Sequence, residues 1–209
     1  MTTTAHKSKT PWPELEAETE DGRRRRSGRS RRQIIKAMFE LLREGNMSPT
    51  AVEVAERANV GLRTVFRHFE DMESIFEEMT EELKSVTMPK VLAPLESRDW
   101  RGQLFELTNR IAEVYESVFP MQVALVIRRF QSEVLTTQYQ KDVDLLRSTL
   151  RSILPPTIVK DRDLFAAIEV NLTFATWRRL REDQKLSVER AKSTLDRILT
   201  ALIADVDVA

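Results

Sequence analysis

The chain contains no cysteine, only five glycines and two histidines among its 209 residues. Without cysteine it can form neither a disulfide nor a thiolate metal site, so nothing points to an oxidising compartment. No uninterrupted apolar run approaches the roughly 20 residues that a membrane-spanning helix needs. Residues 1–32 are almost wholly polar, unlike a signal segment. We therefore expect a cytoplasmic protein with no membrane partner.

The scarcity of glycine goes with an abundance of Leu, Arg, Glu and Ala, and strand-like alternation of β-branched and polar residues is absent. This composition predicts an all-α fold. The two histidines, His6 and His68, stand in no metal-binding HExxH pattern, and there is no glycine-rich phosphate loop or nucleophile–base arrangement. We expect no enzyme activity, no catalytic residue, no metal and no cofactor.

Charge of either sign is plentiful, but the net charge of zero conceals an uneven distribution. Residues 23–69 hold twelve Arg and Lys against four Glu, a net charge of +8, so the remainder carries −8. Seven of the twelve basic residues lie within residues 23–32, which argues against random scatter. A basic segment attached to an acidic body indicates a polyanionic partner for that segment alone.

Three segments follow from the composition. Residues 1–29, an acidic stretch and then an arginine-rich one, bury too little apolar surface to fold, so we expect a disordered N-terminal arm. Residues 30–76 form a small helical domain and residues 77–209 a larger one. Beyond a first helix near 31–43, the apolar periodicity and the prolines predict further helices at 71–87, 101–119, 121–132, 135–154, 161–182 and 187–205.

Residues 50–69 carry the pattern of two short helices joined by a tight turn. Thr50 and Glu53 are spaced as a capping box at the start of the first helix. Asn59 tolerates the left-handed backbone that a tight turn requires, and Gly61 can cap the second helix. The small residue Ala55 permits a close crossing. This arrangement is typical of a helix-turn-helix.

The second of these helices has two different faces. Val65 faces inward, where Val54, Ala58 and Val60 hold the crossing. The outward face carries Leu62, Arg63, Thr64, Arg67 and His68. Arginine and threonine side chains on such a face suit the major groove of DNA, where they reach base edges and phosphates. An amphipathic core hairpin is the alternative interpretation.

Residues 31–76 resemble the DNA-binding domain of the TetR family of bacterial transcriptional regulators. The matching positions are Thr50, Ala55, Ala58, Val60, Thr64, Val65, Phe66, Arg67, His68, Phe69, Asp71, Met72, Glu73 and Ile75. The resemblance implies an N-terminal three-helix helix-turn-helix domain and a C-terminal helical ligand-binding and dimerisation domain. The DNA-facing set that it implies is Thr50, Gly61, Leu62, Arg63, Thr64, Phe66, Arg67 and His68, with Arg29 and Arg31 from the arm.

Three positions depart from the family pattern. Phe66 replaces a tyrosine and Met72 a lysine, both phosphate contacts in the family, and Asn59 stands where glycine is commoner. Fewer phosphate contacts weaken sequence-independent affinity and its salt dependence. We expect the arginine arm to compensate by entering the minor groove, where arginine reads a narrow groove.

The segment 161–182 has two opposed apolar faces, whereas a surface helix has one. A second face needs a second partner, which can be another subunit paired through a two-fold axis together with the final helix. Burial within one subunit is the alternative. The predicted dimer interface comprises Ala166, Ala167, Val170, Phe174, Trp177, Leu195, Leu199 and Leu202.

A ligand pocket follows from the resemblance, since family members bind small molecules among the helices of the C-terminal domain. Its candidate lining residues are Phe105, Asn109, Tyr115, Phe119, Met121 and Phe130, although each is also a plausible core residue. The resemblance thus implies a homodimeric repressor that binds a palindromic operator in double-stranded DNA and responds to an unknown small-molecule effector. A nonspecific nucleic-acid-binding protein that uses the arginine arm is the alternative.

Overall fold

The computed structural model describes residues 22–206, with side chains from residue 28 onward. All regular elements in this range are helical, which confirms the all-α fold. No helix in the range is both long enough and apolar enough to cross a membrane. The contacts divide the chain into two units: residues up to Met88 with Val118–Leu135, and Pro89–Ser117 with Thr136 onward. The sequence predicts one boundary at residues 76/77, whereas the contacts also assign Val118–Leu135 to the first unit, because the helix at 119–128 packs on the first helix.

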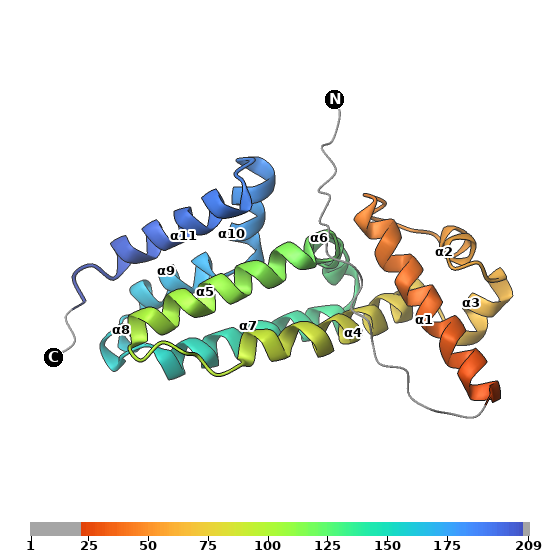
Figure 1. Ribbon diagram of the computed structural model, residues 1–209, viewed down its shortest axis with the longest axis horizontal. Helices are drawn as coiled ribbons and strands as arrows, with labels where there is room; N and C mark the ends of the chain where they lie inside the picture. The colour runs from red at the N-terminus through yellow and green to blue at the C-terminus, as the bar shows by residue number, and fades with distance from the viewer. Residues whose placement is uncertain (1–21, 207–209) are drawn as a thin grey trace. The chain divides into compact units, whose positions relative to one another are not determined.

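The first unit is a cluster of helices around α1 (orange to red in Figure 1). Its elements are α1 (Gly22–Arg43), α2 (Ala51–Arg57), α3 (Leu62–His68), most of α4 (Met72–Leu92), α6 (Phe119–Arg128) and the 3-10 turn η1 (Arg129–Gln131). Helix α1 packs against α2, α3 and α6. Ile34, Met38 and Leu42 of α1 are fully buried, as are Ile75, Phe76 and Met79 of α4. Their three- and four-residue spacing places each set on one helical face.

Helix α1 begins at Gly22, ahead of the start predicted at Arg31. The expectation of a disordered arm is therefore wrong for residues 22–29, while residues 1–21 lie outside the described range. Arginine is a good helix former, and no proline interrupts the segment, so the helix extends backward from its buried portion. The arginine-rich segment is an extension of α1.

Pro89 and Pro120 lie inside helices rather than between them. Helix α4 continues past Pro89 to Leu92, so the predicted stop before this proline is wrong. A proline inside a helix removes the hydrogen bond that its N–H would donate, and α4 ends three residues later, at Leu92. Pro120 lies in the first turn of α6, where its missing N–H would have had no helical partner. The predicted break between α5 and α6 is confirmed.

The second unit is a bundle in which α5 lies beside α11 (green and blue in Figure 1). Its elements are α5 (Trp100–Ser117), most of α7 (Glu133–Ile153), α8 (Pro156–Lys160), α9 (Arg162–Asn171), α10 (Phe174–Arg178), the π-helical turn η2 (Arg179–Asp183) and α11 (Val188–Leu202). The core contains Leu104 and Leu107 of α5, Leu150 of α7, Ile168 of α9 and Leu199 of α11. Each of these helices contributes one apolar face to the shared core.

The predicted single helix over 161–182 is wrong, because α9 ends at Asn171 and α10 starts at Phe174. Thr173 is the N-cap of α10, and its hydroxyl accepts a hydrogen bond from the amide of Thr176. The Tyr115 hydroxyl donates to the carbonyl oxygen of Leu172, 3.2 Å away. Together these side chains satisfy backbone groups that an interrupted helix would leave without partners.

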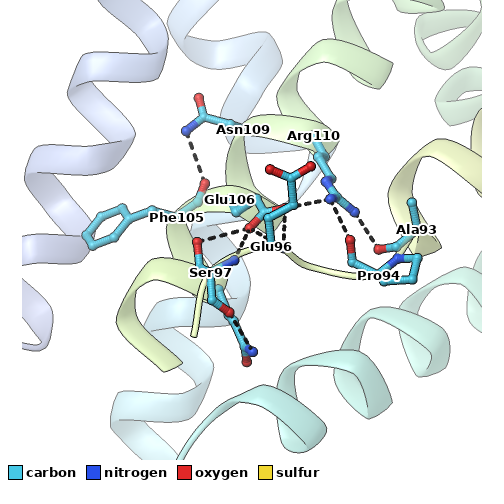
Figure 2. Close-up of polar contacts among 9 residues, drawn as sticks. Ala93, Pro94, Glu96, Ser97, Phe105, Glu106, Asn109 and Arg110 are labelled. Atoms are coloured by element: carbon cyan, nitrogen blue, oxygen red, sulfur yellow. Dashed lines mark hydrogen bonds and ion pairs between the residues drawn. The ribbon is translucent and has the colours of Figure 1, made fainter. Parts of the chain in front are cut away.

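The connection between α4 and α5 is held against α5 by two of its side chains (Figure 2). The Glu106 carboxylate accepts hydrogen bonds from the amides of Glu96, at 3.0 Å, and Ser97, at 3.1 Å. These bonds lower the pKa of Glu106. Arg110 forms an ion pair with Glu106 and donates to two backbone carbonyls of the connection. The loop is therefore fixed at its backbone.

Candidate nucleic-acid interface

Thr50 starts α2 through the predicted capping box, which the structure confirms. Its hydroxyl accepts from the amide of Glu53, and the Glu53 carboxylate accepts from the amide of Thr50 at 2.8 Å. Asn46 also donates to this carboxylate, and together these bonds lower the pKa of Glu53. Thr50 is exposed, so its backbone and hydroxyl are rigidly placed at the surface.

The turn between α2 and α3 has the geometry that its residues predict. Asn59 adopts a left-handed backbone with φ 53°, and the Val60 amide donates to the carbonyl of Ala55 at 3.0 Å. Gly61 is the N-cap of α3, and its carbonyl accepts from the amide of Thr64 at 2.7 Å. Gly61 has a negative φ that any residue can adopt, so the backbone conformation does not require glycine at this position. The turn sets the crossing of α2 and α3.

Helix α3 is anchored from behind and open in front. Val65 and Phe69 are 1% and 3% exposed, whereas Arg63 and Arg67 are exposed and Thr64 is half-buried. Leu62 and Phe66, one turn apart, are also exposed, at 41% and 52%. The outward orientation agrees with the sequence pattern. Contact of these side chains with DNA stays a prediction.

His68 lies at the end of α3 and is only half-buried. Burial lowers its pKa, and the guanidinium groups of Arg67 and Arg31 lower it further. Its Nε2 atom is buried and has no hydrogen-bond partner among the described residues. Because Nε2 is enclosed, a neutral His68 could donate a hydrogen bond to a phosphate only from Nδ1. It would carry no positive charge to attract the phosphate.

Arg31, which is predicted to contact DNA, forms hydrogen bonds within the first unit. Its Nε donates to Oε1 of Glu78 at 2.6 Å, its Nη2 pairs with Oε2 of the same carboxylate, and its Nη1 donates to the carbonyl of His68 at 2.6 Å. A DNA contact at Arg31 stays a prediction, although each of its three nitrogens already donates to a partner within the unit. Arg29 is exposed on α1. The sequence gives no sign of a partner 47 residues away.

A second ion pair joins α1 to α2 behind the interface. Both terminal nitrogens of Arg57 donate to the Glu44 carboxylate, at 2.8 and 2.6 Å, and this contact lowers the pKa of Glu44. Glu40 lies 3.8 Å from the same guanidinium. Arg57 counts toward the basic surplus of the segment, yet it acts in packing. Val52 on α2 is 50% exposed, and the motif did not single it out.

The six predicted pocket residues do not form one site. Tyr115 lines a small cavity in the second unit with space for about one water molecule, whose other lining residues include Thr108, Asn171, Thr173 and Trp177. Burial raises the pKa of Tyr115, so its hydroxyl stays protonated. Tyr115 also packs edge-on against the ring of Phe174. Helical spacing does not predict that Trp177 and Asn171 line a cavity, because it predicts one continuous helix where the structure has a break after Asn171.

The other five belong to packing or to the surface. Phe105 and Asn109 lie on α5, where Phe105 packs at the edge of the core and Asn109 donates to the Phe105 carbonyl (Figure 2). Phe119 and Met121 are core residues of the first unit, 4% and 3% exposed. Phe130 is 76% exposed on η1, so its assignment to a pocket is wrong.

The predicted dimer residues divide into two groups. Phe174, Trp177, Leu195 and Leu199 are buried in the second unit, so assigning them to an interface is wrong. The break before α10 turns Phe174 and Trp177 inward, where the Trp177 indole donates to Glu116 at 3.2 Å. Ala166 and Val170 of α9 are exposed, and Ala167 and Leu202 are half-buried. Only this second group leaves apolar surface uncovered.

Comparisons with known proteins bear on the first unit and on the fold. Residues 34–79 match the family model described as bacterial regulatory proteins of the tetR family. No curated protein matches the sequence. The crystal structure of a transcriptional regulator from Rhodococcus sp. Rha1 is similar in fold, with a TM-score of 0.66 and 17% identity over 86% of this chain and 99% of that one.

Proposed function

The chain belongs to the TetR family of bacterial transcriptional regulators by its N-terminal DNA-binding domain, and from this premise we propose that it is a ligand-responsive repressor. It binds a palindromic operator in double-stranded DNA as a homodimer and releases it when a small molecule binds. The observation that carries this proposal is α3, fixed behind by Val65 and exposed in front.

Helix α3 supports a base-reading role through its polar front. Arg63 and Thr64 near its start reach base edges, since the first residues of a recognition helix lie deepest in the major groove. Thr50 contacts a phosphate from the start of α2. Arg67 serves either purpose. An arginine with two hydrogen bonds to guanine contributes about 1–3 kcal/mol of discrimination.

Leu62 and Phe66 add an apolar component to this front. Both side chains are exposed and lie on the same face, and Phe66 has no hydroxyl to donate to a phosphate. In the major groove the apolar group that distinguishes bases is the thymine methyl. The operator half-site therefore contains thymines opposite these side chains, next to the guanine read by Arg63.

Dimerisation is supported by the apolar surface that the second unit leaves open. Val170 is 54% exposed and Ala166, one turn earlier on α9, is exposed too. Helix α9 packs against α11, where Leu202 is half-buried, so the two helices offer adjoining surface. A two-fold pairing through this surface presents two α3 helices to one operator.

Effector binding is supported by the cavity beside Tyr115. Its lining combines apolar side chains with a tyrosine hydroxyl and the side chains of Thr108 and Asn171, a mixture typical of small-molecule sites. The cavity is too small for a metabolite, so an effector enlarges it by moving its walls. The bound form of the protein then differs from the DNA-binding form, which is the condition for release.

Selection of duplexes from a random-sequence pool tests this function. The wild-type chain is expected to enrich an inverted repeat whose half-site centres lie about one helical turn, ~34 Å, apart. The complex should contain two protein chains per duplex. Binding that enriches no sequence, or one chain on an asymmetric site, would contradict the proposal and indicate a nonspecific nucleic-acid-binding protein.

A further inference from the structure

Arg31 connects three parts of the first unit through one guanidinium. It is paired with both carboxylate oxygens of Glu78 on α4 and donates to the carbonyl of His68 at the end of α3. Its Cζ also lies 4.4 Å from the centre of the ring of Phe69, the C-cap of α3. Helices α1, α3 and α4 therefore meet at this single side chain.

The contact matters because α3 cannot hold its own position. A helix of seven residues is far below the length at which isolated helices are stable. The carbonyls of its last turn have no amide partners within the helix. Arg31 donates a hydrogen bond to one of these carbonyls, that of His68. A cation is also favourable at this end of a helix.

Glu78 fixes Arg31 in turn. A bidentate arginine–carboxylate pair has a defined geometry, which a single contact lacks. The side chains are 42% and 28% exposed, so the pair is partly shielded from water. These bonds use three of the five N–H groups of Arg31, and the Glu78 carboxylate beside them disfavours the approach of a phosphate.

We propose that Arg31 is a positioning residue that, with Glu78, holds α3 at the angle required to read DNA, and that it makes no DNA contact itself. This inference rests on the proposed function. It has an unusual consequence. Removing the negative charge of Glu78 should weaken specific binding to a polyanion, although simple electrostatics predicts the opposite.

The experiment compares Glu78→Gln with Glu81→Gln, which removes the same charge from an exposed position one turn further along α4. Arg31→Ala and Arg31→Lys complete the set. The probes are the duplex that the wild-type chain selects from a random pool and a random duplex of equal length. Helicity and thermal unfolding of each variant establish that it is folded, and affinity is expressed per active molecule.

Glu78→Gln and Arg31→Ala should each lower affinity for the selected duplex about tenfold, within the range for directly coupled residues, and the double variant should lose no more than either. Arg31→Lys, which keeps the charge but loses the bidentate pair, should fall nearly as far. Affinity for random duplex and the slope of log K against log salt should stay at wild-type values. Glu81→Gln should bind at least as well as wild type.

Two results would overturn the inference while the proposed function stands. One is that Glu78→Gln binds the selected duplex as Glu81→Gln does. The other is that Arg31→Ala weakens both duplexes alike and lowers the salt slope by about one, as loss of a phosphate contact does, with Arg31→Lys restoring it. If the wild-type chain selects no duplex, the proposed function fails and this inference fails with it.

Discussion

At the scale of residues, the interface separates side chains that hold α3 from side chains that α3 presents. Val65 and Phe69 are buried, while Arg63, Phe66 and Arg67 are exposed on the same short helix. The charge of a residue does not decide its group. Arg31 and Arg57 join helices through carboxylates, whereas Arg63 and Arg67 have no ion pair among the described contacts. Substitutions in the two groups should therefore act on different quantities.

Arg63→Ala should change specificity without changing stability. Loss of a bidentate contact to guanine should reduce discrimination at one base pair of each half-site by about 1–3 kcal/mol, while the thermal midpoint stays at the wild-type value. Val65→Ala, the matched core control, should instead lower the free energy of unfolding by about 1–3 kcal/mol. Affinities for a panel of single-base operator variants measure the first, and denaturant titration the second. Equal discrimination by wild type and Arg63→Ala would remove Arg63 from the reading set.

His68 should make stability depend on pH. Its folded-state pKa lies below the ordinary value of 6.5, so between these two values the unfolded chain binds more protons than the folded one. The contribution of the neutral imidazole is fully present above 6.5 and is lost as pH falls through that window. Wild type should therefore lose more stability than His68→Gln between pH 7.5 and pH 5.5, as measured by denaturant titration at each pH. Parallel losses in the two proteins would contradict the assigned cause.

Phe66 and Leu62 should read thymine methyl groups. Replacing thymine by uracil in the selected duplex removes only the 5-methyl group. We expect weaker binding by wild type at one or two positions per half-site, and no further loss in Phe66→Ala at the position that Phe66 contacts. Substitution by uracil at positions outside the footprint is the control. If every uracil-containing duplex binds like its thymine parent, these side chains serve another purpose.

At the scale of elements, the sequence was sufficient where local signals determine the structure. The Thr50–Glu53 box, the left-handed Asn59 and the inward Val65 are all observed as predicted. It was insufficient where distant side chains decide. The break after Asn171 depends on Tyr115 of another helix, and the end of α3 depends on Arg31 and Glu78. The apolar periodicity of one segment cannot predict which side chains of other helices will contact it.

Tyr115→Phe should test the break between α9 and α10. The change removes one donor and leaves the carbonyl of Leu172 without that hydrogen bond. We expect the free energy of unfolding to fall by about 1 kcal/mol, a typical value for one such bond. A stability equal to wild type would show that α10 is held in place by other contacts.

Two glycines in helices should respond in opposite ways to alanine. A Cβ on Gly102 would lie 2.8 Å from the Cβ of Ser97, so Gly102→Ala should displace the connection held by Glu106 and destabilise the chain. No atom lies within 4 Å of the position of a Cβ on Gly28. Gly28→Ala should therefore stabilise α1 by about 0.5–1 kcal/mol, the usual gain over glycine in a helix. The thermal unfolding midpoints of both variants, compared with wild type, test these two expectations. A higher midpoint for Gly102→Ala would show that Ser97 can move away from the added Cβ.

At the scale of the whole molecule, one unit contains the DNA-binding motif and the other contains the cavity and the uncovered apolar surface. The motif could be located from sequence because every protein that reads DNA this way needs the same crossing of α2 and α3. The cavity and the pairing surface could not be assigned residue by residue. Their residues are ordinary core types whose orientation depends on how the helices pack.

Methylation interference on the selected duplex tests the central claim most directly, because dimethyl sulfate modifies guanine N7 in the major groove and adenine N3 in the minor groove. The account predicts that methylation of one guanine in each half-site blocks wild-type binding, and that Arg63→Ala loses sensitivity at that guanine alone. Interference confined to adenines, or identical patterns for wild type and Arg63→Ala, would show that α3 does not read the major groove.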